Sequence, residues 1–286
     1  MAARDIYTSS TTWVCPNGVT SVDVECWAGG GSGGISDAVG TNGSSGGGGG
    51  AYSKQTAISV TAGNSYTVTV GAGGGAVTSQ NIAGNIGGDS WFSTSGTVLA
   101  KGGGAGLFGT GAALGAAAGG ASASGVGTTK FSGGNSGTVA GTSGSGGGAG
   151  AGNANAGGNG TFNDSVYYSG SGSGGTGGVS GGGNGGASRG YSAVTAPGGG
   201  SGCFDRQAAS TTGVAGAGGQ VQLSYVKNAT FSNADLVHST DLFSAITAYA
   251  KTILDVVHGT DLLASVKFAF NNMVRSVSSW INQIRN

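Results

Sequence analysis

The chain has 286 residues, of which 67 are glycine and two are proline, and its formal net charge is zero with only 8% charged residues. The scarcity of proline and the lack of a strict Gly-X-Y period exclude collagen, and the missing basic excess argues against a nucleic-acid partner. No apolar run is long enough to cross a bilayer and the N-terminus lacks an apolar signal region, so we expect a protein made in the cytoplasm, with no membrane insertion.

The first strand-like segments flank a turn near the N-terminus. Ile6–Val14 and Val22–Trp27 are separated by the turn "CPNG" at Cys15–Gly18, and turns of this composition join strands. In "VDVECW" the two valines and the cysteine alternate with Asp, Glu and Trp. This alternation predicts a strand with one apolar face.

Three more stretches have the same character. Ala57–Val60 and Ser65–Val70 flank a turn with glycine, Asp89–Ala100 contains two short strands around Ser93–Gly96, and Gln220–Val226 alternates between polar and apolar residues. Short strands of this kind predict a small β-sandwich or an incomplete barrel.

Two glycine-rich inserts interrupt these strands, at about residues 29–50 and 102–219. One interpretation is mobile loops. The other is a set of packed polyglycine-II-type helices, extended with three residues per turn, because glycine alone lets such backbones approach closely. We favour the ordered interpretation, because disordered segments usually carry more net charge and fewer aromatics than this chain, with 7% aromatic residues.

No catalytic constellation is recognisable, so we expect no enzyme, no cofactor and no metal. Cys15, Cys26 and Cys203 lack metal-site spacing and are expected to be buried or half-buried thiols, with a Cys15–Cys26 bridge left open. His238 and His258 each follow an aspartate by three residues. A metal site between chains is one interpretation, but a histidine flanking a helix is the one we favour.

Glycine almost vanishes after Val226, where "DLVHSTDLFSAI" returns as "DVVHGTDLLASV" 20 residues later. Each copy places Thr and Asp at the start of an amphipathic run, which predicts two helices from about Asp241 and Asp261. Apolar residues then follow a heptad spacing, which favours a seam for oligomerisation or attachment, either between chains or within a helical hairpin. The seam residues are Leu242, Ile246, Tyr249, Ile253, Val256, Leu263, Val266, Phe270, Met273, Val277, Trp280 and Ile284.

Isolated aromatic and basic residues occur along the long glycine-rich insert. Such groups could contact a sugar or a protein by stacking and hydrogen bonding, although each could instead pin the glycine segments. The candidates for receptor contact are Tyr167, Tyr168, Tyr191, Phe204 and Arg206.

Several motifs occur in a characteristic order: "TTWVCPNGVTSVDVECWAGGGSGG", "GNSYTVTVGAGGG", "GGDSWF", "VLAKGGGAG" and "GAGGQVQLSYV". Over about Ile6 to Val226 the chain resembles the glycine-rich domain of bacteriophage tail and tail-fibre proteins. The matching positions are Trp13, Pro16, Gly18, Val19, Thr20, Trp27, Tyr66, Val68, Val70 and Gly71, while Cys15 and Cys26 depart from the pattern. The resemblance implies a structural role in a virion and recognition of a host surface.

The sequence therefore predicts a mainly β protein: a small β-sandwich base with long, packed glycine-rich insertions in residues 1–226, then a pair of amphipathic α-helices in residues 227–286. We expect a homo-oligomeric virion component, with a trimer favoured, that meets other virion proteins and a host glycan or protein. A capsid decoration or cement protein, a non-viral glycine-rich structural or ice-binding protein, and an enzyme with an unreadable site remain alternatives.

Overall fold

The computed structural model describes residues 2–36, 42–110, 113–139, 144–161, 174–179, 181–187, 195–203 and 213–227. This part of the chain is mainly β, and all its named strand pairs are antiparallel. The helical structure within it is a 3-10 turn at Ser122–Ser124. The helices predicted after Val226 lie outside the described residues.

Two sheets form the base, which we call the sandwich. The five-stranded sheet has the order β1-β11-β3-β5-β10, and the four-stranded sheet has the order β2-β6-β7-β8. The strands of the first are β1 (Ala2–Tyr7), β11 (Gln220–Val226), β3 (Ser21–Trp27), β5 (Tyr52–Ser59) and β10 (Thr129–Phe131). The strands of the second are β2 (Thr11–Val14), β6 (Ser65–Thr69), β7 (Ser90–Phe92) and β8 (Val98–Ala100).

The core lies between these sheets because each strand turns its alternate apolar residues inward. The predicted face of β3 is confirmed, since Val22, Val24 and Cys26 are buried. Trp13 on β2 lies at the centre, with ring centroids 5.5–5.9 Å from those of Tyr66, Phe92 and Tyr225. The last strand was predicted with its observed bounds, Gln220–Val226.

The prediction of one strand over Ile6–Val14 is wrong. This stretch is split between β1 and β2, which belong to different sheets. β1 pairs with β11 and β2 pairs with β6, so the chain crosses the sandwich at residues 8–10. For the same reason β2 and β3 do not form a hairpin around Cys15–Gly18.

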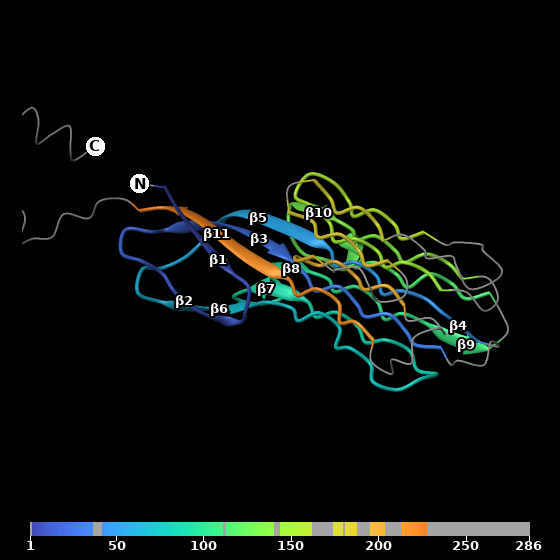
Figure 1. Ribbon diagram of the computed structural model, residues 1–286. Helices are drawn as coiled ribbons and strands as arrows, with labels where there is room; N and C mark the ends of the chain where they lie inside the picture. The colour runs from blue at the N-terminus through green and yellow to red at the C-terminus, as the bar shows by residue number, and fades with distance from the viewer. Residues whose placement is uncertain are drawn as a thin grey trace, which may run out of the picture. The chain divides into compact units, whose positions relative to one another are not determined.

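Three short strands were missed inside the inserts. β10 extends the five-stranded sheet through its pairing with β5. β4 (Asn42–Ser44) and β9 (Phe108–Thr110) form a two-stranded ribbon of their own, which lies at the end of the glycine-rich region away from the sandwich (Figure 1).

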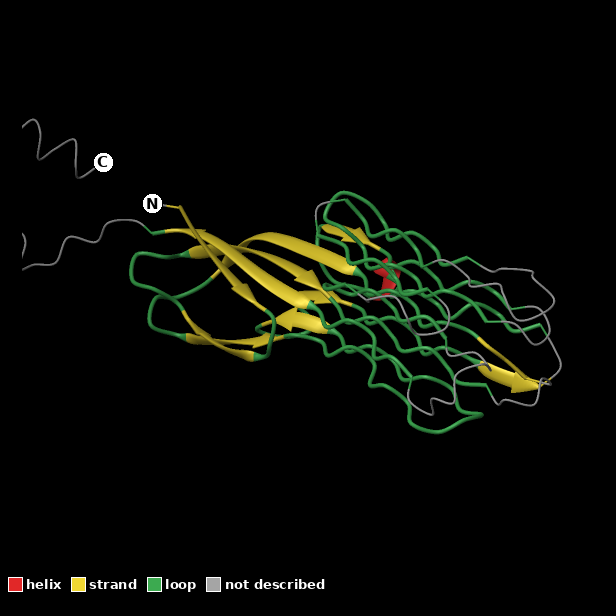
Figure 2. Cartoon of the chain, in the orientation of Figure 1, coloured by secondary structure: helices red, strands yellow, loops and turns green. Residues whose placement is uncertain are grey.

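The glycine-rich segments all begin at one end of the sandwich. β3, β6, β8 and β10 run into them, and β5, β7 and β11 emerge from them, as the antiparallel pairing requires. Figure 2 shows these segments as green extended chains continuing beyond the yellow strands. We call this array the bundle; its described parts are residues 28–36, 42–51, 71–89, 101–110, 113–121, 132–139, 144–161, 174–179, 181–187, 195–203 and 213–219.

Backbone hydrogen bonds connect each bundle segment to many others. Three consecutive residues, Gly29, Gly30 and Gly31, engage six separate segments. Their N–H groups donate to the carbonyls of Gly88, Ala217 and Gly48, and their carbonyls accept from Gly103, Gly74 and Ser201, at 2.8–3.0 Å. In a β-sheet the same bonds would reach only two neighbours, so this region is not a sheet.

The partners repeat every three residues. From Gly146 to Ala151 the N–H groups donate in turn to Thr161, Gly186, Gly47, Gly158, Gly183 and Gly50. Residues three apart therefore bond to the same neighbouring segment, as expected for an extended chain with three residues per turn. The partner numbers fall along two neighbours and rise along the third, so the bundle contains antiparallel and parallel contacts.

Candidate functional site

The expected receptor contacts, Tyr167, Tyr168, Tyr191, Phe204 and Arg206, lie outside the described residues. Four of them follow described segments: Tyr167 and Tyr168 come after residues 157–161, and Phe204 and Arg206 come after residues 198–203. The bonds of Gly146 to Thr161 and of Ala149 to Gly158 show that residues 157–161 run away from the sandwich, since 145–151 return to it. Residues 198–203 also run outward, because Gly50 bonds to Gly198 and Gly47 to Ser201.

The opposite end of the sandwich carries the chain's N-terminus and the exit toward the C-terminus. Ala2 is paired with Val226 in the last register position of β1 and β11. Residues 227–286 therefore begin at the end away from the bundle. The expected oligomerisation residues Leu242–Ile284, together with His238 and His258, lie outside the described residues.

The bundle has no room for side chains at its interior glycines. A Cβ on Gly48 would lie 2.0 Å from the carbonyl oxygen of Ala118, and one on Gly49 would lie 1.9 Å from that of Ala149. Real Cβ atoms do not approach carbonyl oxygens this closely, so the spacing of the segments is set by backbone contact.

Serine hydroxyls replace carbonyls where the backbone pattern is interrupted. Six buried serines each accept a hydrogen bond from a backbone N–H of another segment, at 2.7–3.3 Å. These are Ser32, Ser45, Ser90, Ser136, Ser145 and Ser201. Sequence reasoning missed this role because serine in a glycine-rich run looks like a linker residue.

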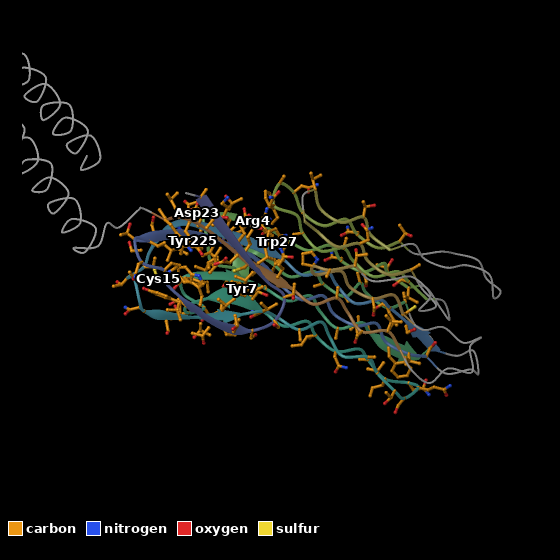
Figure 3. All side chains as sticks on the ribbon, turned by 60° about the vertical axis from the view of Figure 1, so that its left-hand side comes forward. Arg4, Tyr7, Cys15, Asp23, Trp27 and Tyr225 are labelled. Carbon is orange, nitrogen blue, oxygen red and sulfur yellow. The ribbon has the colours of Figure 1, made fainter. Side chains whose placement is uncertain are left out.

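An aromatic cluster joins the bundle to the outer face of the five-stranded sheet. Trp27 and Tyr52 are buried against Ala151 and Phe131, and the ring centroids of Trp27 and Tyr52 are 5.0 Å apart. Gly181, with φ of +117°, lies over the Trp27 ring, where its Cβ would be 3.0 Å from a ring carbon. In Figure 3 Trp27 lies on the bundle side of the sandwich and Cys15 at its other end.

Polar side chains lie next to this cluster on the same outer face of the five-stranded sheet. Glu25 accepts hydrogen bonds from Tyr52 at 3.0 Å and Gln222 at 3.2 Å, and pairs with Lys54 at 3.0 Å, while Arg4 bonds to Gln222. Burial and the Glu25 carboxylate raise the pKa of Tyr52 well above its ordinary value. The groups are mutually satisfied, which is typical of a structural network.

A second network holds the first strand to the core. The Asp5 carboxylate accepts hydrogen bonds from the Tyr225 hydroxyl at 2.8 Å and from Trp13 Nε1 at 3.2 Å. Burial, and then the hydrogen bond to Asp5, raise the pKa of Tyr225 to about 12. Nearby, a hollow of about 300 Å³ is lined by Tyr225, by Asp23 and by smaller residues of β1, β3 and β11. The Asp23 carboxylate accepts the amide hydrogen of Ala57 at 2.8 Å.

Cys15, Cys26 and Cys203 are buried, as expected, and the alternative of a Cys15–Cys26 bridge is wrong, because these two thiols are not bonded to each other. Burial raises the pKa of Cys26 far above its ordinary value, so this thiol is unreactive. Within the described residues no cluster of three His, Cys, Asp or Glu side chains could hold a metal ion. No helix in that part of the chain has the length and apolarity to cross a membrane.

Comparison with known proteins identifies the family. The family described as "Glycine-rich domain" matches residues 6–226, which contain every strand of the sandwich except the start of β1. No curated protein matches the sequence significantly. The match covers more than half of the chain, and the family's span coincides with the sandwich and its bundle. The chain therefore belongs to the glycine-rich domain family.

Proposed function

We propose that this protein is a non-enzymatic structural protein of a bacteriophage virion, in the tail fibre or tail tip, that contributes to recognition of the host surface. The virion context comes from the resemblance of the ordered motifs in residues 6–226. The observation that carries the display role is the separation of the two ends: the chain leaves the sandwich at Val226, opposite the end from which the bundle extends.

The bundle suits this role as a rigid support. We interpret its segments as polyglycine-II-type helices, because their hydrogen-bond partners repeat every three residues. Each segment is held by several neighbours, so a connection between two segments starts and ends at positions with little freedom. Tyr167, Tyr168, Phe204 and Arg206 lie in connections between outward- and inward-running segments and are our candidates for contact with a glycan or protein. Tyr191 is the fifth candidate.

The segment 227–286 is our candidate for attachment. Its heptad spacing favours a homo-oligomeric junction, with a trimer preferred, that meets another virion protein. A capsid decoration protein and a non-viral structural or ice-binding protein are the alternatives, and the experiment below separates them.

The test is cryo-electron microscopy of intact particles combined with an adsorption assay. Density for the bundle at the outermost point of the tail supports the proposal. Density flat on the capsid lattice, or no copy of the chain in the particle, contradicts it.

In the adsorption assay, the purified full chain should compete with particles for host cells. The double variant Tyr167→Ala, Tyr168→Ala should compete less well, whereas Thr56→Ala, at an exposed position on β5, should compete like the unchanged protein. Equal competition by all three would remove these tyrosines from the contact.

A further inference from the structure

The sequence contains four Asn-Gly pairs, beginning at Asn17, Asn42, Asn159 and Asn184. In such a pair the backbone nitrogen of glycine can approach the asparagine side-chain carbonyl, because glycine has no side chain to obstruct it and rotates freely. The reaction requires an accessible asparagine and a glycine amide that can move toward it. In the structure, the pairs differ in whether they meet these two requirements.

Asn17 and Gly18 occupy the centre of an exposed turn between β2 and β3. Val19 donates a hydrogen bond to the carbonyl of Pro16 at 3.2 Å, and Gly18 has φ of +77°, which together describe a type II turn. Asn17 is exposed. Among the described residues, no hydrogen bond holds the Asn17 side chain or the Gly18 amide.

Two pairs in the bundle, Asn159–Gly160 and Asn184–Gly185, are held at both reacting groups. The Asn159 side-chain oxygen accepts the amide hydrogen of Asn135 at 2.9 Å, and Gly160 donates its amide hydrogen to the carbonyl of Asn135 at 2.9 Å. The Asn184 side-chain oxygen accepts from Gly177 at 2.7 Å, and the Gly185 amide donates to Gly175 at 2.9 Å. Both pairs must break two hydrogen bonds before they can react.

We propose that the fold leaves Asn17–Gly18 open to spontaneous deamidation and isoaspartate formation, while it protects the pairs at Asn159 and Asn184. The Gly18 amide nitrogen attacks the Asn17 side-chain carbonyl carbon, loses its proton to solvent, and forms a five-membered succinimide as the carbon–nitrogen bond to ammonia breaks. Water then adds to either imide carbonyl. Opening at one carbonyl gives aspartate, and opening at the other gives isoaspartate; no redox partner is needed.

The product changes the end of the sandwich from which the C-terminal segment leaves. It adds a negative charge to a chain whose formal net charge is zero. Isoaspartate also lengthens the turn backbone by one carbon. Cys15 stays anchored beside it, because its amide donates to Asn64 at 2.9 Å and its carbonyl accepts from Gly63 at 2.8 Å. The residue before the turn is therefore expected to keep its place.

The test is peptide mapping by mass spectrometry after incubation of the full folded chain in mildly alkaline buffer, with chromatographic separation of the aspartyl and isoaspartyl peptides. Asn17 should convert roughly 10-fold to 100-fold faster than Asn159 and Asn184, because those pairs must first break two hydrogen bonds. In denaturant the three rates should converge, since all three pairs are then exposed.

Two results would overturn the proposal. One is an Asn17 peptide that converts as slowly as the two bundle peptides in the folded chain. The other is equal and rapid conversion at all three sites without denaturant, which would mean that the fold protects none of them. Asn17→Ser serves as the matched control, because it keeps the exposed turn and Gly18 but should leave no product at this position.

Discussion

Single glycines determine whether the bundle can close. Gly48 donates its amide hydrogen to Gly104 and accepts from Gly31, while a Cβ at this position would lie 2.0 Å from the carbonyl oxygen of Ala118. Gly48→Ala should therefore force two backbones apart. We expect it to lower the free energy of unfolding by about 3 kcal/mol or more, at the upper end for overpacking, as measured by denaturant unfolding.

The matched control is Gly75→Ala in the same region. A Cβ on Gly75 would meet no atom within 4 Å, and its φ is not in the left-handed range. The substitution should change stability by less than about 1 kcal/mol, and in the favourable direction, because alanine restricts the unfolded chain. Equal losses in the two variants would mean that close backbone packing is not what requires glycine.

Single buried serine hydroxyls also contribute to the stability of the bundle. The Ser201 hydroxyl accepts the amide hydrogen of Gly33 at 2.8 Å and donates to the carbonyl of Val214 at 2.7 Å. Ser201→Ala leaves the buried Gly33 amide and the half-buried Val214 carbonyl without this partner, at a cost of about 2 kcal/mol or more. Ser79→Ala, at an exposed position of the bundle, should be neutral in the same unfolding assay.

The raised pKa of the buried tyrosines predicts that the protein loses stability at alkaline pH. The pKa of Tyr225 is raised to about 12 by burial and by its bond to Asp5, whereas an unfolded tyrosine titrates near 10. Between these values the unfolded chain has lost a proton that the folded chain keeps, so the free energy of unfolding falls as pH rises. The contribution is complete below about pH 10 and is lost through about pH 12.

Tyr225→Phe should make this alkaline decline shallower, and the variant should also lose stability at neutral pH because Asp5 loses a donor. The measurement is the denaturation midpoint as a function of pH. Burial also raises the pKa of Tyr7 and Tyr52, so part of the decline should remain. A decline identical to that of the unchanged protein would exclude Tyr225 as a contributor.

At the scale of elements, strands with alternating apolar residues could be predicted and strands without them could not. β11 and the buried face of β3 follow directly from their alternation. β10 has only three half-buried residues, and β4 and β9 contain glycine, so their pairing depends on segments distant in sequence. The division between β1 and β2 has the same cause, because it is set by pairing with β11 and β6.

The C-terminal seam gives a prediction for the element that lies outside the described residues. Phe270 occupies a central seam position in the sequence, so Phe270→Asp should place a charge in an apolar layer and disrupt assembly. Sedimentation should show a smaller species, whereas Ser279→Asp, between seam positions, should leave the oligomer intact. A folded Phe270→Asp variant with an unchanged oligomer would mean that the seam is intramolecular.

At the scale of the whole molecule, composition predicted an ordered glycine-rich region but not its arrangement. The repeated glycines are nearly interchangeable as sequence, so nothing in them specifies that Gly29 should bond to Gly88 and Gly30 to Ala217. The sandwich supplies this information, because its paired strands enter the bundle in a fixed order. The candidate contact residues could be proposed only from their chemistry, since they carry no spacing pattern.

The sandwich and bundle should consequently unfold together. Bundle segments hold one another by backbone hydrogen bonds and a few serine hydroxyls, and they need the sandwich strands for their order. The sandwich in turn needs the bundle to cover Trp27 and Tyr52. Take a variant in which Trp27 is the only tryptophan, with the other three replaced by phenylalanine. Its tryptophan fluorescence reports the junction, and its far-UV circular dichroism reports the strands. The two midpoints in denaturant should coincide, as for one cooperative unit. An earlier fluorescence transition would show instead that the bundle separates from the junction while the paired strands persist, so that the sandwich does not need the bundle.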